Sequence, residues 1–296
     1  MQSLYTITTG NNIYKDSLTK GEKFSIFYHN IFDYPLNFYE ISRWQAGERK
    51  VPRGANLINI CGRNGYWFME GKDGLIYKRI LRQRISSRKR KIAERASKFL
   101  SLIPSIKMIA VTGSLAMENS DEDGDIDLMV ITKKGTLWLT RLLSYIILST
   151  VHFSLRRPND RVQKDRLCLN LWLDESDLVW DKNKRNFYTA HEIAQIIPLV
   201  DKYETYNRFL IANKWILSFW PKSVRIREKG EQKEANTTFL SLLLNPFERL
   251  AYQLQLIYMR RKITREVVSP TRAIFHPYDW GKLISRRLSL RSLLPM

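Results

Sequence analysis

The chain has little of what marks a secreted protein. Only two of its 296 residues are cysteine, Cys61 and Cys168, far apart and each in an apolar setting. The sequence therefore offers neither a disulfide framework nor a cysteine zinc site. Its first ten residues lack a basic stretch followed by an apolar core, so no secretory signal is evident. We expect a cytoplasmic globular protein.

A long uninterrupted apolar run is also missing. The most apolar long segment, residues 137–155, contains Arg141 and His152 together with serine and threonine. A membrane span needs about 20 predominantly apolar residues, so a buried amphipathic helix explains this segment better. We expect no membrane span.

Acidic residues are scarce. The chain has 29 Asp and Glu against 49 Lys and Arg, which gives a net charge of +20. This balance favours polyanionic partners, most simply DNA or RNA, although an anionic membrane surface would attract the same charge. A hydrophobic content of 44% with 12% aromatic residues predicts buried cores in two or three domains.

Residues 109–131 have the pattern of a strand, a glycine turn and a second strand. The turn is Gly113-Ser114, and the second strand opens with Asp125 and Asp127. Side chains alternate across a strand, so both carboxylates project from one face. Mg²⁺ prefers oxygen ligands, and two ions about 3.5–4 Å apart can clamp the oxygens of phosphoryl transfer. The pattern predicts a metal site; the alternative is a surface strand with acidic ends.

The Gly-Ser pair, a spacer of about ten residues and Asp-hydrophobic-Asp resemble the nucleotidyltransferase superfamily typified by DNA polymerase β, in a bacterial form with an N-terminal winged-helix module. The resemblance covers residues 105–175. It implies that Gly113 and Ser114 bind the triphosphate of an NTP substrate, and that Asp125 and Asp127 are catalytic ligands of Mg²⁺ or Mn²⁺. The implied reaction transfers a nucleoside monophosphate to a hydroxyl acceptor and releases pyrophosphate.

A third carboxylate, which the resemblance places on the neighbouring strand, is not evident. The next strong strand covers residues 167–173, and alternation puts Cys168, Asn170 and Trp172 on its inward face. An asparagine can bind a metal through its amide oxygen but cannot accept a proton at neutral pH. The site works with two carboxylates, or is inactive, or takes a third ligand. Candidates for that ligand are Asn170, Asp165 and Asp174.

Residues 20–80 resemble a winged helix-turn-helix. We expect helices over 20–34, 38–44 and 53–60, with a capping box of Asn37 and Glu40 on the second. Strands 66–69 and 75–77 would form the wing. In winged helices that bind duplex DNA, the third helix enters the major groove. The alternative is a module that docks a partner protein or positions a substrate.

Cations are concentrated in residues 78–95, which predict a basic amphipathic helix. Next to a phosphotransfer site, such a helix indicates nucleic-acid contact, although a charge run is often only a solvated face. The expected nucleic-acid contacts are Arg53, Arg84, Arg88, Lys89, Arg90 and Lys91. Lys133 and Arg141 are candidates to neutralise nucleotide phosphates; the alternative is a lysine at a surface turn and a snorkelling helix arginine.

Further helices are expected over 189–195, 203–220 and 246–263. His191 beside Glu192 lacks a second histidine at zinc-protease spacing, so we expect a histidine on a helix surface.

The predicted fold class is α/β (α+β), a small mixed-sheet nucleotidyltransferase domain with an N-terminal winged helix and C-terminal helices. The expected domains are a winged-helix-like domain over 1–80, a nucleotidyltransferase domain over 81–222, a linker over 223–236 and a helical region over 237–296. The preferred function is nucleotidyl transfer to nucleic acid, particularly RNA or a tRNA-like end, with a protein hydroxyl or a small molecule left open as the acceptor. The alternative is a non-catalytic nucleic-acid-binding regulator on the same scaffold.

Overall fold

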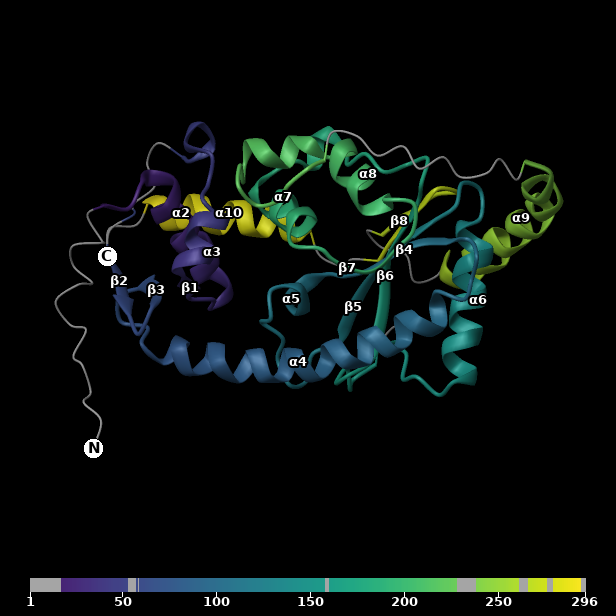
Figure 1. Cartoon of the computed structure of the whole chain (residues 1–296), viewed down its shortest axis with the longest axis horizontal. Coiled ribbons are helices and arrows are strands. Elements are labelled where there is room, and N and C mark those ends of the chain that lie inside the picture. The colour runs from purple at the N-terminus through teal and green to yellow at the C-terminus, as the bar shows by residue number, and fades with distance from the viewer. Residues whose placement is uncertain are drawn as a thin grey trace.

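The computed structural model describes residues 17–52, 57, 59–157, 160–227, 238–260, 266–275 and 279–293, with the backbone alone in 238–244 and 289–293. Two sheets organise these residues, one with the strand order β1-β3-β2 and one with the order β7-β4-β5-β6-β9-β8. Helices pack around both sheets (Figure 1). The expected mixed α/β class is confirmed. Within this part of the chain, no helix is long and apolar enough to span a membrane.

The N-terminal unit contains the smaller sheet. Asn37 is the N-cap of its second α-helix. The Asn37 side chain accepts from the backbone N–H of Glu40, and the Glu40 carboxylate accepts from the backbone N–H of Asn37, as the capping box predicts. Its elements are α2 (Lys20–His29), η1 (Asn30–Phe32), β1 (Leu36–Asn37), α3 (Phe38–Arg43), η2 (Glu48–Lys50), β2 (Ile60–Arg63) and β3 (Tyr66–Met69).

The hairpin of this unit lies earlier in the chain than the sequence pattern suggested. β2 and β3 are joined by Asn64 and Gly65, both with positive φ (52° and 77°), which is the turn that matches the twist of two paired strands. Residues 75–77 do not form the expected second wing strand but start helix α4 (Gly74–Leu100). Of the expected helix over 53–60, residues 53–56 and 58, Arg53 included, lie outside the described residues, and Ile60 belongs to β2.

Helix α4 links the N-terminal unit to the central sheet and runs beneath both (Figure 1). Most of its buried positions lie three, four or seven residues apart, so one face packs along the helix. The basic helix expected over 78–95 is therefore part of a longer one, and residue 80, the expected domain boundary, lies inside it.

The central sheet places the acidic strand in its middle. β4 (Ile106–Val111) pairs antiparallel with β5 (Ile126–Thr132) and with β7 (Ile197–Asp201). β5 pairs in parallel with β6 (Leu167–Asp174), and α6 (Leu137–Thr150) lies in the connection between them. The C-terminal region, expected to be helical, also supplies β8 (Val267–Val268) and β9 (Arg272–Ile274), and β9 pairs with β6.

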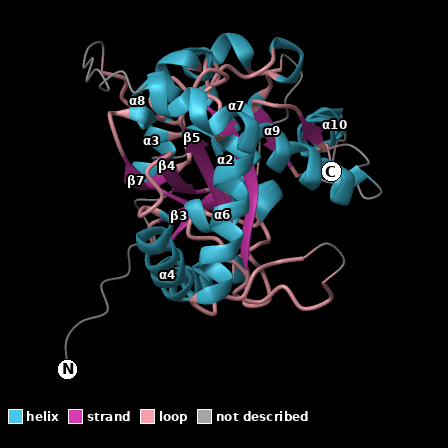
Figure 2. Ribbon diagram, turned by 90° about the vertical axis from the view of Figure 1, so that its right-hand side faces the viewer, coloured by secondary structure: helices cyan, strands magenta, loops and turns pink. Residues whose placement is uncertain are grey.

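Helices cover both faces of this sheet (Figure 2). One apolar core joins α4, α6 and α9 (Thr238–Arg260) to the face that carries Ile126, Leu128 and Val130. The other core joins the N-terminal unit and the remaining helices to the face that carries Met129 and Ile131. These remaining elements are α7 (Phe187–Ala194), α8 (Thr205–Ala212), η4 (Lys214–Ser218) and α10 (Trp280–Leu293). Two short helices, α5 (Gly113–Ala116) and η3 (Lys182–Lys184), complete the described part.

Two expected segments differ in detail. The helix over 203–220 breaks at Asn213, whose buried side-chain amide donates to the carbonyl of Leu178 and so leaves the helix for a tertiary contact. In the segment expected as a linker, Ser223 is buried, and residues 228–237 lie outside the described residues.

Candidate functional site

The two carboxylates of the motif meet on one face of β5. One oxygen each of Asp125 and Asp127 and the Sγ of Cys168 all lie within 4.8 Å of one another. Cys168 is the residue of β6 that pairs with Asp127 in the parallel register. The common face that strand alternation predicts is therefore present, and a single cation could touch all three groups.

The glycine turn touches the second carboxylate. Gly113 has a φ of +60°, and a Cβ atom at this position would lie only 2.7 Å from Oδ2 of Asp127. The backbone N–H of Thr112 donates to the carbonyl of Asp127 at 3.1 Å. Glycine is thus required both for the left-handed backbone and for the close approach. Ser114 follows on the turn with its side chain exposed.

Asn170 approaches the same carboxylate from a bulge in β6. The register shifts between Leu128/Leu169 and Met129/Leu171, so Asn170 is an extra residue in its strand. Its Nδ2 donates to Oδ1 of Asp127 at 2.6 Å, and its own Oδ1 is buried without a hydrogen-bond partner among the described residues. The bulge also overturns the expected alternation, because Trp172 packs in the core on the opposite face.

The donor set fits a hard divalent cation. The oxygens of Asp125 and Asp127 are ligands that Mg²⁺ or Mn²⁺ prefers, and the amide of Asn170 contacts Asp127 through Nδ2. The third group within 4.8 Å of both carboxylates is the thiol of Cys168. Of the three candidates for the third ligand, Asn170 is the one that the fold brings to the pair.

The other two candidates are engaged elsewhere. Asp174 lies at the far end of β6, six residues from Cys168 and so roughly 20 Å along an extended strand. Its carboxylate accepts from the backbone of Gly135 at 2.6 Å and of Ser176 at 2.8 Å, so its proposed role as a metal ligand was wrong. Asp165 forms ion pairs with Lys89 at 3.1 Å and Arg88 at 3.3 Å. It does not belong to the cluster around Asp127.

Arg156 is a member of the site that the sequence did not indicate. Its Nη1 contacts Oδ2 of Asp125 at 2.5 Å and Sγ of Cys168 at 3.7 Å. It lies beyond the C-terminal end of α6, among other basic residues, so nothing in the sequence distinguishes it from a surface arginine. In the fold it neutralises the carboxylate of Asp125 and would have to share it with a bound cation.

Burial makes the cluster a proton-linked site. Burial first, and then the charge of Asp125, raises the pKa of Asp127 to about 7. Burial likewise raises the pKa of the Cys168 thiol above its ordinary range. Metal ligands bind in their deprotonated form, so a cation that binds Asp127 near neutral pH displaces a proton.

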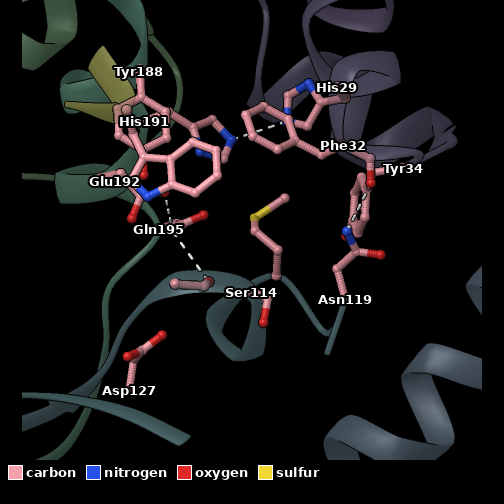
Figure 3. Close-up of a pocket in the computed structure, with 13 residues that line it drawn as sticks. His29, Phe32, Tyr34, Ser114, Asn119, Asp127, Tyr188, His191, Glu192 and Gln195 are labelled. Atoms are coloured by element: carbon pink, nitrogen blue, oxygen red, sulfur yellow. Dashed lines mark hydrogen bonds between the residues drawn. The ribbon is translucent and has the colours of Figure 1, made fainter. Parts of the chain in front are cut away.

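A cavity of about 290 Å³ opens above Asp127 (Figure 3). It lies between the N-terminal unit, the glycine turn, β5, α7 and α10. It is lined by His29, Phe32, Tyr34, Gly113, Ser114, Met117, Asn119, Asp127, Tyr188, His191, Glu192, Gln195 and Trp280.

Helix α7 brings a further carboxylate to this cavity. Gln195 donates from Nε2 to Oε1 of Glu192 at 2.8 Å and to the carbonyl of Gly113 at 3.2 Å, which ties α7 to the glycine turn. Burial first, and then the charge of Asp127, raises the pKa of Glu192 to about 8. The spacing of Glu192 and Gln195 puts them on one side of a helix, but the sequence has no feature that marks this side as a cavity wall.

A histidine pair fastens the N-terminal unit to α7. Nε2 of His29 lies 3.0 Å from Nε2 of His191 (Figure 3). Nδ1 of His29 donates to the carbonyl of Ser25 at 2.8 Å, so His191 is the donor within the pair. Burial lowers the pKa of His29 to about 3 and that of His191 well below its ordinary value. The expectation of a surface histidine was therefore wrong for His191, which is neutral and buried.

The cations of α4 differ in what they can bind. Lys89 has a fully buried side chain whose Nζ donates to the carbonyls of Glu122 and Gly124 and pairs with Asp165. Lys89 is therefore not available for the expected nucleic-acid contact, because a lysine on the packed face of a helix needs acceptors and finds them in the loop before β5. Arg88 pairs with Glu122 at 3.1 Å, and Arg90 lies 3.9 Å from Glu118. Arg84 and Lys91 are exposed and remain available.

The two expected phosphate contacts lie away from the cavity. Lys133 follows the last residue of β5, roughly 20 Å from Asp127 along the strand. Arg141 is packed between the rings of Tyr145 and Phe275 and donates to Gln255 on α9. Neither residue lines the cavity, so the fold does not bring them to Asp127 as the sequence interpretation expected.

We expect Lys89→Met to lower the free energy of unfolding by about 2–4 kcal/mol, because it leaves the Glu122 and Gly124 carbonyls and Asp165 without their buried cation. Urea denaturation at neutral pH measures the change. Lys91→Met, on the exposed side of the same helix, is the matched control and should shift unfolding by less than about 0.5 kcal/mol. Equal effects of both substitutions would contradict the assigned role.

Together these side chains form a cation site at the floor of a cavity that the N-terminal unit closes. Two carboxylates and a thiol are the groups that could hold a cation there, the glycine turn lies against Asp127, and the carboxylate of Glu192 lines the cavity. No protein-family model and no curated protein matches the chain.

Proposed function

We propose that the protein is a metal-dependent nucleotidyltransferase, which transfers a nucleoside monophosphate from an NTP to a hydroxyl acceptor and releases pyrophosphate. The observation that carries this proposal is the contact of the Gly113 turn with Asp127, at the point where Asp127 and Asp125 share one face. The backbone of the turn therefore lies beside a candidate cation site. A triphosphate needs both a backbone that it can approach closely and cations that neutralise its charge.

The topology supports the same proposal. An antiparallel strand pair joined through the glycine turn, followed by a helix and a parallel third strand, agrees with the nucleotidyltransferase resemblance of residues 105–175. In the N-terminal unit, the order β1-β3-β2 with helices before and after β1 supports the proposed winged helix.

In this proposal Asp125, Asp127 and Asn170 hold Mg²⁺ or Mn²⁺, which would neutralise phosphoryl oxygens and polarise the reacting phosphorus. The chain itself provides orientation. The Gly113 turn and Asn170 fix the carboxylate of Asp127, while Gln195 fixes the turn against α7. Arg156 orients the carboxylate of Asp125 through a direct contact.

Label transfer tests the proposal. The protein is incubated with each labelled NTP, Mg²⁺ and pools of RNA and of small hydroxylated acceptors. We expect transfer by the wild type and none above background with Asp125→Ala/Asp127→Ala, because loss of both ligands removes on the order of several kcal/mol of transition-state stabilisation. Asp123→Ala, an exposed acid in the loop before β5, is the control and should leave transfer unchanged.

A second candidate is a nucleic-acid-binding regulator on the same scaffold. It is favoured by the net charge of +20 and by Arg84 and Lys91, which remain exposed on α4 outside the cavity. RNA binding that is unchanged in the double variant, without transfer from any nucleotide by the wild type, would support the regulator and contradict the enzyme.

A further inference from the structure

We propose that the cavity above Asp127 is the acceptor subsite and that it takes a small hydroxylated organic cation, with Glu192 as the partner of the positive charge. The ligand is called an acceptor because this inference rests on the proposed nucleotidyltransferase function. It differs from the nucleic-acid acceptor that the net charge of the chain suggested.

The charge of the cavity wall is opposite to that of the protein as a whole. Among the described residues that line the cavity, those with a formal charge are Asp127 and Glu192, and none is lysine or arginine. The two histidines of the wall are neutral. Apart from a metal ion at Asp127, a phosphodiester chain that entered this space would meet no cation, whereas an ammonium group would be attracted by Glu192.

Three arginines lie near the wall without lining the cavity, and two of them are paired with carboxylates. Arg79 pairs with Glu40 at 2.7 Å, and Arg82 pairs with Asp121 at 2.5 Å. Arg43 donates to the carbonyl of Ser223 at 3.1 Å. None of the three lines the cavity.

The carboxylate of Glu192 lacks a positively charged partner among the described residues. Within the described part of the chain it forms no ion pair, and its hydrogen-bond donor is the neutral amide of Gln195. A half-buried carboxylate without a cation is unfavourable when ionised, which agrees with its pKa of about 8. A bound ammonium group would supply the missing charge.

The remaining wall suits a compact ligand with apolar and hydroxylated parts. Phe32 and Tyr188 lie near-parallel with ring centroids 6.5 Å apart, and Trp280 adds a third aromatic side chain. Aromatic faces bind organic cations and the C–H surfaces of polyols. The volume of about 290 Å³ lies at the lower end of small-molecule pockets, and the His29–His191 contact closes the side toward the N-terminal unit.

Calorimetric binding with two matched ligands tests the inference. N-methylglucamine is a hydroxylated secondary amine that is protonated at pH 8, and sorbitol has the same hydroxyl chain without the charge. With the full-length protein and Mn²⁺, we expect the amine to bind at least about 10-fold more tightly than sorbitol, because one desolvated ion pair with Glu192 contributes that difference in affinity. Glu192→Gln should abolish this preference and leave Mn²⁺ binding intact, whereas Glu192→Asp should retain part of it. Glu94→Gln, an exposed acid on α4, should change nothing.

The outcomes separate the two proposals. Equal binding of amine and sorbitol, or an amine preference that survives Glu192→Gln, overturns the cation subsite alone. A short RNA that displaces the amine would also overturn it, in favour of a nucleic-acid acceptor. If Mn²⁺ binding and nucleotidyl transfer are absent while the amine preference depends on Glu192, the proposed function fails and the cation pocket stands.

Discussion

The Asp127→Asn variant is expected to be inactive and, at pH 8.5 without metal, more stable than the wild type by about 2–3 kcal/mol. The folded protein raises the pKa of Asp127 to about 7 through burial and the charge of Asp125. In the unfolded chain the same carboxyl titrates near about 3.9. The stability that the Asp127 carboxyl contributes is fully present below the unfolded-state pKa and is lost as the pH rises through the folded-state pKa of about 7.

Asparagine removes this penalty because it does not ionise, yet its amide oxygen can still accept from Asn170. Urea denaturation at pH 5 and at pH 8.5 with a chelator measures the effect, which should be small at pH 5. Transfer activity should fall on the order of 10³-fold with the lost ligand.

Asp125→Asn provides the contrast. Its carboxylate contacts Arg156 at 2.5 Å, so loss of the charge should destabilise the fold by about 1–2 kcal/mol and not stabilise it. An Asp127→Asn variant that is less stable than the wild type at pH 8.5 would show that Asp127 is not held in an unfavourable charged state.

Gly113→Ala is expected to lower the free energy of unfolding by about 2–4 kcal/mol and to weaken Mn²⁺ binding at least about 10-fold. Two separate causes contribute. The φ of +60° is strained for alanine, and the new Cβ would lie 2.7 Å from Oδ2 of Asp127. The carboxylate therefore has to move away from the turn, which disturbs the geometry that it shares with Asp125.

Gly71→Ala separates these causes. Gly71 also has a positive φ, +80°, but a Cβ there meets nothing within 4 Å. We expect it to lower stability by about 1 kcal/mol, the backbone term alone, with no change in Mn²⁺ affinity. Chemical denaturation and manganese titration by electron paramagnetic resonance measure both quantities. Identical Mn²⁺ affinities for the two variants would refute the close approach at Gly113.

Several side chains of the site destabilise the protein when no ligand is bound. Asp127 and Glu192 are half-buried carboxylates with raised pKa values, and Asn170 has a buried amide oxygen without a hydrogen-bond partner in the described part of the chain. Such groups are unfavourable in the free protein and become favourable when a cation or a substrate provides the missing contacts. Ligand-dependent stabilisation at alkaline pH would therefore report binding even before the acceptor is identified.

The sequence by itself determined the local part of this site. The glycine turn, the shared face of Asp125 and Asp127, and the capping box at Asn37 depend on residues within a few positions of one another. Alternation along a strand and capping of a helix need no knowledge of the rest of the fold. The positions of the helix through Arg88 and of the strand through Cys168 follow for the same reason.

The tertiary structure decided which residue of β6 approaches the two carboxylates, where the cavity lies, and which cations stay exposed. Asn170 reaches Asp127 across 43 positions, Gln195 reaches Gly113 across 82, and His29 meets His191 across 162. A bulge in β6 chose Asn170 and turned Trp172 to the opposite core, and packing buried Lys89 while it left Lys91 exposed. Burial and pairing arise between distant segments, so periodicity within one segment cannot specify them.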